Sequence, residues 1–378
     1  MPMRRTMTTL VVGLVLLSVV AVAHAQQSEM DALRSSVKQL SDQLKAVTDK
    51  LQQLEAKQAA PVAAPAAAKP SWTDKLAVSG YWQSRYEARA DTRDEFIMRR
   101  MYLNFAGKWN DKTTSLLTFS RIPSANDPNI ELEAAQVNYR FADDYSVTFG
   151  QIFNNFGWDT WESSSKRLPF DRWAAGEGVA SRPGRAGIRG LYYAGAVDRA
   201  VAVTRHARGN EPTIIAGVGN GNYNKGDNDD NKVVTLDLKF KRPNGIQYGA
   251  SWLYGNYTVD AVAPALPVTQ PRRALGLYFH KDPAPWGFQA EYLTGQMFGA
   301  DVNGWYGQVA RNLGKGTPYV RYEQFDQNED TAGNTYMSLR GGYAYQLDKN
   351  NELTLELQDA HSGAVNYSQT GIQWQLGF

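Results

Sequence analysis

The chain has 378 residues, of which 43% are hydrophobic and 12% aromatic, and it contains no cysteine. The absence of cysteine excludes disulfides and thiolate metal sites. The formal net charge of +2 gives no support for a nucleic-acid partner.

The N-terminus has the features of a secretory signal peptide. Arg4 and Arg5 precede the apolar run LVVGLVLLSVVAVA, and AHA follows at residues 23–25. A basic start, a short apolar stretch and an A-x-A site predict cleavage after Ala25, so residues 1–25 are the expected signal peptide. An uncleaved membrane anchor is the alternative, which the cleavage site and the polar QQSEMD after it disfavour. No later segment has 18 consecutive apolar residues, so no spanning helix is expected.

Residues 26–58 are predicted to form a periplasmic α-helical coiled coil. Apolar residues recur in alternating steps of three and four over nearly four heptads, at Met30, Leu33, Val37, Leu40, Leu44, Val47, Leu51 and Leu54. A single amphipathic helix on a membrane surface is the alternative, but its polar face mixes acidic and basic residues. The Ala- and Pro-rich segment that follows is expected to be a linker, residues 59–71.

From residue 72 to residue 378 the apolar pattern has a period of two. In LTLELQ the leucines 353, 355 and 357 oppose polar neighbours, and VVTLDLKFK at residues 233–241 alternates in the same way. This pattern predicts strands with one apolar face. Soluble sandwiches and barrels also alternate, but their strands average five or six residues. Several runs here reach ten or more.

Short turns alternate with longer loops along this region. The expected turns are residues 110–112, 142–144, 196–198, 242–245, 282–286, 314–316 and 348–350. The expected loops are 90–95, 123–130, 153–184, 220–231, 258–271, 298–302, 327–334 and 361–367. This gives an all-β fold, a 16-stranded antiparallel transmembrane β-barrel preceded by the coiled coil, with the turns facing the periplasm. Residues 199–219 exceed a plain strand and indicate a bulge or an extra loop.

The chain ends on the alternating strand GIQWQLGF, with Phe378 as its last residue. A barrel has no edge, so its last strand pairs with its first and stays ordered. Phe378 is expected in the periplasmic aromatic girdle, where the ending resembles the assembly signal of outer-membrane proteins. The expected partners are therefore outer-membrane lipid and the barrel-assembly machinery.

Most of residues 76–378 resemble the phosphate-selective porin O/P family of outer-membrane channels. The resemblance rests on FIMRRMYLNFAGKW (96–109), VTFGQIFNNFGWD (147–159), RPGRAGIRGLYYAG (182–195) and VGNGNYNKGDNDDNK (218–232), above all on the Arg-Arg pair. It implies a homotrimeric 16-stranded porin in the outer membrane of a Gram-negative cell, with its N-terminal segment in the periplasm. The resemblance does not identify which positions of this chain correspond to the lysines and arginines that give named members their phosphate preference.

The lumen of such a barrel is a water-filled channel unless a segment folds inside it. The longest loop, residues 153–184, is the expected constriction. The candidate anion path comprises Arg100, Lys166, Arg167, Arg172, Arg182, Arg185 and Arg189. Further lumen arginines expected from alternation are Arg85, Arg89, Arg140, Arg321 and Arg340, facing Glu87, Glu291, Glu323 and Glu356. Arginine clusters favour anions such as phosphate.

Other functions remain open at this stage. Residues 71–378 hold 32 basic and 33 acidic residues, so a general non-selective porin with a balanced transverse field is one alternative. A structural protein tethered through its stalk is another. A hydrolase is a third, with His206, His280 and His361 as its histidines. The acidic loop GDNDDN (226–231) lacks Ca²⁺-loop spacing. We expect no enzyme activity, no cofactor and no metal.

Overall fold

The computed structural model describes residues 72–90, 93–121, 130–153, 156–160, 162–179, 188–189, 197–221, 227, 229–259, 268–297, 299–363 and 366–378, and ten positions between 35 and 50. The chain divides into two units, Met1–Pro70 and Ser71–Phe378. The ten positions in the first unit are helical and exposed. The signal peptide, the linker up to Ser71 and all apolar residues of the heptad seam lie outside the described residues. The signal peptide, the coiled coil and the linker therefore stay predictions. Within the described residues, no helix is long and apolar enough to cross a membrane.

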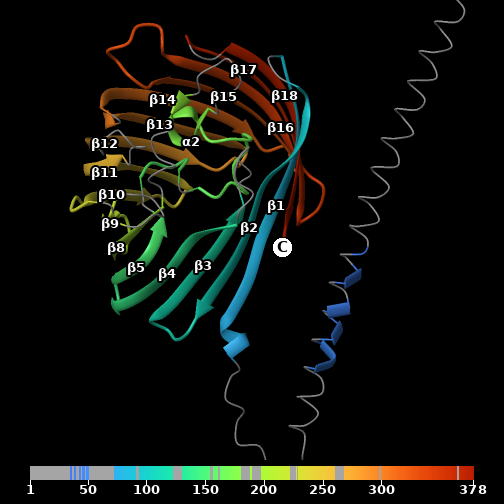
Figure 1. The fold of residues 1–378 in the computed structure, drawn as a ribbon, viewed down its shortest axis with the longest axis vertical. Coiled ribbons are helices and arrows are strands. Elements are labelled where there is room, and N and C mark those ends of the chain that lie inside the picture. Colours follow the sequence, from blue (N-terminus) through green and yellow to red (C-terminus); the bar gives the residue numbers. More distant parts are fainter. Residues whose placement is uncertain are drawn as a thin grey trace, which may run out of the picture. The chain divides into compact units, whose positions relative to one another are not determined.

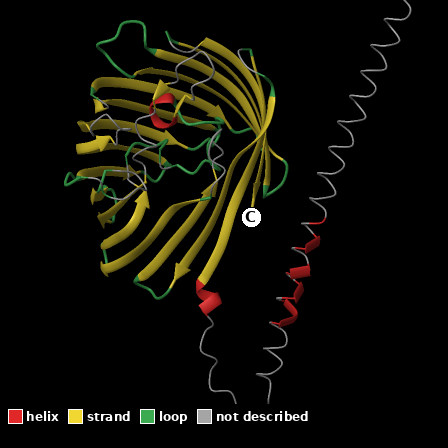
Figure 2. Cartoon of the chain, viewed as in Figure 1, coloured by secondary structure: helices red, strands yellow, loops and turns green. Residues whose placement is uncertain are grey.

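Sixteen strands of the described residues close an antiparallel barrel (Figures 1 and 2). The first half comprises β1 (Leu76–Arg89), β2 (Glu95–Lys108), β3 (Thr113–Arg121), β4 (Glu131–Ala142), β5 (Tyr145–Phe153), β8 (Val197–Arg205), β9 (Thr213–Gly219) and β10 (Val233–Lys241). The second half comprises β11 (Ile246–Val259), β12 (Val268–Lys281), β13 (Trp286–Met297), β14 (Ala300–Arg311), β15 (Gly316–Asp326), β16 (Tyr336–Gln346), β17 (Asn351–His361) and β18 (Asn366–Gly377). The predicted barrel and its strand number are confirmed.

Four shorter elements complete the fold. The 3-10 helix η1 (Trp72–Lys75) leads into β1. The helix α2 (Ala174–Glu177) and a small hairpin of β6 (Gly178–Val179) with β7 (Ile188–Arg189) belong to the connection between β5 and β8. Figure 1 shows α2 inside the ring of strands.

The barrel closes between β1 and β18. The two strands pair from Tyr81 opposite Gly377 to Arg89 opposite Gln369. The backbone of Phe378 continues this pairing, since its N–H donates to the Gly80 carbonyl and its carbonyl accepts from the Gly80 N–H, both at 3.0 Å. No edge is left at this seam, so the strand remains hydrogen-bonded to its last residue.

The two faces of the barrel wall differ in chemistry as the alternation predicts. Outward side chains such as Trp82, Trp305 and Leu357 are apolar and exposed, which suits contact with lipid tails. Inward side chains are mostly polar and buried, among them Gln83, Arg85 and Glu323. The wall therefore presents polar groups to the interior of the barrel and apolar groups to the lipid outside.

One predicted turn is wrong. The turn predicted at 196–198 is not formed, because Val197 and Asp198 belong to β8, which pairs with β5 along its whole length. The seventh short connection lies instead between β8 and β9, at residues 206–212. The long segment 199–219 thus contains a turn between two strands, and among the described residues no barrel strand lies between β5 and β8. The prediction thus had one strand too many before residue 197 and one too few in 199–219, so the total number of strands was still right.

The connection from β13 to β14 is shorter than predicted, since Met297 already pairs with Ala300.

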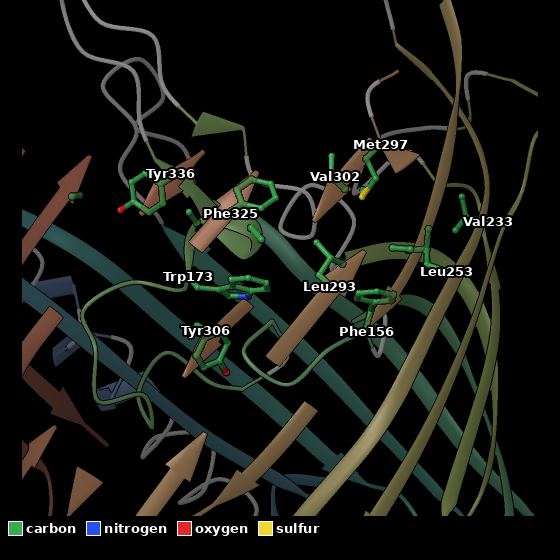
Figure 3. Close-up of a cluster of buried hydrophobic side chains, with 14 of the residues drawn as sticks. Phe156, Trp173, Val233, Leu253, Leu293, Met297, Val302, Tyr306, Phe325 and Tyr336 are labelled. Carbon is green, nitrogen blue, oxygen red and sulfur yellow. The ribbon is translucent and has the colours of Figure 1, made fainter. Parts of the chain in front are cut away.

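The connection from β5 to β8, residues 154–196, is called the inner loop from here on. The inner loop is the longest connection of the barrel, and its described part contributes Phe156, Trp173, Ala174 and Ala175 to the main buried apolar cluster. Trp173 belongs to this cluster and lies beside Tyr306 and Phe325 of the wall (Figure 3).

Candidate functional site

The inner loop is attached to the wall through its own backbone. The N–H groups of Trp158 and Asp159 donate to the two carboxylate oxygens of Glu291 on β13, at 3.2 and 3.1 Å. Two further wall glutamates repeat this arrangement. The Phe170 N–H donates to Glu356 on β17 at 3.0 Å, and the Ala174 N–H donates to Glu323 on β15 at 3.1 Å.

Aromatic side chains add apolar attachment to these hydrogen bonds. Trp158 stacks on His280 of β12 with 3.9 Å between ring centroids. Trp173 is fully buried and packs against Tyr306 and Phe325, at centroid distances of 5.3 and 6.4 Å (Figure 3). Burying large aromatic rings in a lumen that would otherwise hold water stabilises the inward position of the loop. The prediction that this loop enters the lumen agrees with these contacts.

Asp171 of the inner loop joins three arginines of β1 and β2. Its carboxylate accepts from Arg85 Nη1 at 3.0 Å, from Arg99 Nη2 at 2.9 Å and from Arg100 Nη2 at 3.3 Å. Burial would raise the pKa of Asp171, but these three arginines outweigh it and hold the pKa well below its usual range. Glu177 shares two of the partners, since Arg99 and Arg100 both bind its carboxylate. We call Asp171 and Glu177 with these arginines the ionic latch.

A β-bulge in β2 brings two successive arginines to this latch. Gln83 of β1 pairs with Arg100, and the next residue of β1 pairs with Met98, so Arg99 is the extra residue. Without the bulge Arg99 would face lipid, where a charge is costly. The alternation assigned only Arg100 to the lumen and missed Arg99. An arginine on a predicted lipid face was the signal that could have found it.

Two more ion pairs connect the lumen charges. Arg321 of β15 binds Asp159 of the inner loop at 3.2 Å, and neither side chain is exposed. Arg340 of β16 binds Glu323 at 2.9 Å. The pKa of Asp159 is lowered, because Arg321, Arg167 and Arg172 outweigh the effect of burial. Four of the arginines predicted for the lumen, Arg85, Arg100, Arg321 and Arg340, are therefore paired with carboxylates.

Arg167 differs from these arginines. Its Nη2 donates to the Ser164 hydroxyl at 2.7 Å, while Nε and Nη1 have no hydrogen-bond partner among the described residues. The side chain is buried, and within the described residues no carboxylate lies within ion-pair distance. Burial, followed by the charges of Arg172 and Arg100, lowers its pKa to about 9. The guanidinium therefore remains charged at neutral pH.

A cavity of about 340 Å³ separates the inner loop from the inward faces of β1–β4. The loop contributes Glu162 and Arg172 to its lining, and β4 contributes Glu133. Glu133 reaches the lumen through a second bulge, because Thr118 of β3 pairs with Ala134 and Phe119 pairs with Leu132. The sequence analysis missed Glu133 for the reason that it missed Arg99: strict alternation places it on the lipid face.

The other predicted site residues are dispersed. Arg182 and Arg185 lie outside the described residues, and for Arg189 only the backbone of β7 is described. Lys166 is exposed on the inner loop. Arg89 lies over the ring of Tyr367 at 3.5 Å, and Arg140 is exposed near the end of β4. Arg172 donates to the backbone carbonyls of Asp159 and Glu162, so it shapes the loop as well as lining the cavity.

A serine and a histidine lie close together among the described residues, without the rest of a catalytic triad. Ser146 Oγ and His206 Nε2 lie 3.1 Å apart, but among the described residues no carboxylate contacts the other ring nitrogen. Nor do the described residues include a group of three or more His, Cys, Asp or Glu arranged to hold a metal ion. The described lumen offers charged and hydrogen-bonding groups to a solute rather than a catalytic triad.

Residues 80–263 match the family model of phosphate-selective porin O and P. Over that range the chain belongs to the porin O and P family. The match covers β1 to β11 and includes the inner loop. No curated protein sequence matches the chain.

Solved outer-membrane proteins share the fold of this porin at low sequence identity. An anion-selective porin from Comamonas acidovorans is 13% identical with a TM-score of 0.57, covering 80% of this chain and 99% of that one. The channel DcaP of Acinetobacter baumannii is 12% identical with a TM-score of 0.54, covering 80% and 97%. OmpT of Vibrio cholerae in its trimer form is 11% identical with a TM-score of 0.53, covering 80% and 99%.

The family match and the closed barrel together locate this porin in the outer membrane of a Gram-negative cell, where it forms a channel. Its apolar outer face is the surface that meets outer-membrane lipid. The inner loop occupies part of the lumen and leaves the cavity beside β1–β4. That side of the lumen is the candidate passage.

Proposed function

We propose that this porin passes small hydrophilic solutes by diffusion, and that the inner loop sets a constriction that favours anions such as phosphate. The observation that carries the proposal is the state of Arg167, a buried arginine with two donors that no described group accepts. Its charge persists at neutral pH, whereas the charges of Arg85, Arg100, Arg321 and Arg340 are matched by carboxylates.

The physical reason is local charge. A guanidinium presents several N–H donors in a plane that matches phosphate and carboxylate oxygens. In a narrow passage the fixed charge is weakly screened, so it acts on passing ions more strongly than the same charge at the rim. Lys166 adds a second positive charge next in sequence. Arg182, Arg185 and Arg189 remain predicted members of the anion path.

The test is Arg167→Ala in a planar bilayer with a salt gradient. We expect the reversal potential to shift toward lower anion over cation permeability, and the block by phosphate to weaken. The shift should shrink in concentrated salt, because screening shortens the reach of a fixed charge. Lys349→Ala, on an exposed turn, removes one positive charge elsewhere and serves as the control. An unchanged reversal potential would indicate a general non-selective porin instead.

Arg100 and Arg172 are poor positions for this test. Arg100 belongs to the ionic latch, and Arg172 is bonded to the loop backbone. Substituting either one would move the loop as well as remove a charge. A change in selectivity could then not be assigned to the charge alone.

The domain organisation is part of the proposal. Residues 1–25 are the signal peptide, 26–58 the periplasmic coiled coil, 59–71 the linker and 72–378 the barrel. The heptad seam supports assembly into a homotrimer, and OmpT, which shares the fold, was solved in a trimer form. Sedimentation of residues 26–58 alone and of the whole porin in mild detergent tests this. Monomers in both measurements would refute it.

Two alternatives make different predictions. If the protein is a structural one tethered through its stalk, cells that lack residues 26–70 of it should lose envelope integrity and keep solute uptake. An outer-membrane hydrolase would cleave esters in detergent. We propose that the protein is not an enzyme, so the purified porin should give ion conductance without ester hydrolysis.

A further inference from the structure

The cavity between the inner loop and β1–β4 is lined by groups of both charge signs. Its volume is about 340 Å³, within the size range of small-molecule sites. Glu133 stands on the strand side, and Glu162 and Arg172 stand on the loop side. Tyr81 and Tyr102, stacked at 4.9 Å between ring centroids, form an aromatic surface beside them.

Two carboxylates of this lining have unused acceptor capacity. Glu133 is 5% exposed and Glu162 is 8% exposed. The Tyr102 hydroxyl donates to Glu133 Oε1 at 3.0 Å, but the Oε2 atoms of both glutamates have no hydrogen-bond partner among the described residues. The Thr160 hydroxyl, which also lines the cavity, is in the same state. Buried acceptors of this kind are costly unless a donor reaches them.

Arg172 supplies the opposite charge. Its Nη1 donates to the Glu162 carbonyl at 3.0 Å, which fixes the guanidinium beside the carboxylates. A solute with only a carboxylate would meet Arg172 but would leave the glutamates without a donor. A solute with only an ammonium group would meet the glutamates but would also face the arginine. Neither kind matches the whole lining.

We propose that this cavity is a binding subsite for small amphoteric solutes, which carry an ammonium and a carboxylate group as free amino acids do. The ammonium group donates to Glu133 and Glu162, and the carboxylate faces Arg172. The inference deepens the proposed function and rests on it in one respect, namely that solutes pass between the inner loop and β1–β4. It adds a solute class that net anion preference alone does not predict.

The test compares three solutes of equal carbon number, alanine, propionate and propylammonium, as blockers of single-channel current. Measurements at pH 8 keep Glu162 ionised, since burial and the neighbouring Asp159 raise its pKa to about 7. We expect alanine to block with an apparent dissociation constant about tenfold below that of propionate, the effect of one or two hydrogen bonds to charged groups. Glu133→Gln with Glu162→Gln should remove this difference.

Glu329→Gln is the matched control, because Glu329 lies on an exposed loop between β15 and β16. It should leave the preference for alanine unchanged. Equal block by alanine and propionate in the unmodified porin would overturn the subsite, as would a preference that survives in the double variant. Block by propylammonium as strong as that by alanine would show a cation site and would also overturn it.

The Arg167→Ala measurement separates this inference from the proposed function. If its reversal potential is unchanged while the double variant loses the alanine preference, the anion proposal fails and the subsite stands. If Arg167→Ala shifts the potential while alanine and propionate never differ, the anion proposal stands and the subsite fails.

Discussion

At the scale of single residues, several lumen charges hold the inner loop to the wall. Asp171 accepts from three arginines of two strands, and Asp159 is paired with Arg321. We propose that solutes meet Arg167, Glu133 and Glu162, whose side chains each have a buried atom without a hydrogen-bond partner among the described residues. A list of lumen charges drawn from alternation does not separate these two roles.

Asp171→Asn should weaken the ionic latch. The amide keeps the shape of the side chain but leaves three arginines facing a neutral group. Because the site is partly open to water, we expect a loss of about 1–3 kcal/mol in stability, below the range for fully buried pairs. Single-channel conductance should rise as the loop moves, and the thermal unfolding midpoint should fall.

Asp143→Asn, on an exposed turn, is the control for this change.

The pKa of Asp171 in the folded protein lies below its value in the unfolded chain. The contribution of Asp171 to stability is therefore present above about pH 4 and is lost as the pH falls further. Latch opening between pH 8 and pH 5 would therefore contradict this assignment.

The contribution of Glu162 to stability should depend on pH in the opposite direction. Burial and then Asp159 raise its pKa to about 7, against the opposing charges of Arg167, Arg321 and Arg172. The folded pKa lies above the unfolded value of about 4.3, so ionising Glu162 destabilises the fold as pH rises through this window. Lowering the pH from 8 to 6 removes a negative charge from the passage.

The anion over cation permeability ratio should then rise about twofold between pH 8 and pH 6. Reversal potentials at both values measure it. Glu162→Gln should give the higher ratio at both, with no dependence on pH. A variant that keeps the full pH dependence would assign the titration to another group.

At the scale of elements, most strand positions follow from strict alternation, whereas the bulges do not. Lipid outside and polar groups inside impose a period of two, which the residues of β10 and β17 follow. The bulges in β2 and β4 shift that period by one residue and turn Arg99 and Glu133 inward. Both bulges can be inferred from a charge on the expected lipid face, so the missing information was in the sequence but outside a strict alternation.

The contacts of the inner loop could not be predicted in the same way. Arg85 and Asp171 are 86 residues apart and meet only because the barrel closes around the loop. Length alone indicated that the loop enters the lumen. Which carboxylate meets which arginine depends on the path of the backbone, and no local pattern encodes that path.

Gly157→Ala should loosen the start of the inner loop. Gly157 has φ of +70°, and a Cβ there would overlap the carboxylate of Glu291, which accepts from Trp158 and Asp159. We expect the loss of both hydrogen bonds, about 1–3 kcal/mol each for bonds to a carboxylate, with higher conductance and faster proteolysis within the loop.

Gly333→Ala is matched to this change, because Gly333 has φ of +77° with nothing within 4 Å of a Cβ. It carries the same backbone strain without the collision. Equal effects of the two substitutions would mean that strain, rather than the contact with Glu291, is responsible.

At the scale of the whole molecule, the chain end completes the barrel. The backbone of Phe378 pairs with Gly80, and its side chain is 59% exposed on the outer surface. The pairing needs only main-chain atoms, so a substitution leaves the closed sheet possible. A role of the aromatic ring as an assembly signal is therefore measured during insertion.

Phe378→Ser should lower the amount of porin inserted into the outer membrane several-fold, if the barrel-assembly machinery reads this ending. Tyr345→Ser removes another exposed aromatic ring near the end of a strand and serves as the control. Membrane-embedded yield is the measurement. A yield for Phe378→Ser equal to that of the control would remove the signal role from this residue.

The attachment of the inner loop to Glu291, Glu323 and Glu356 has a consequence for redesign. These wall glutamates bind backbone N–H groups, which every residue except proline possesses. These anchors do not depend on the side chains of the anchored residues, so an exposed loop side chain such as that of Lys166 can be exchanged without removing them. The barrel can therefore serve as a constant scaffold. Exchanging a few such loop residues should change which solutes it prefers, while the membrane-spanning strands keep their sequence.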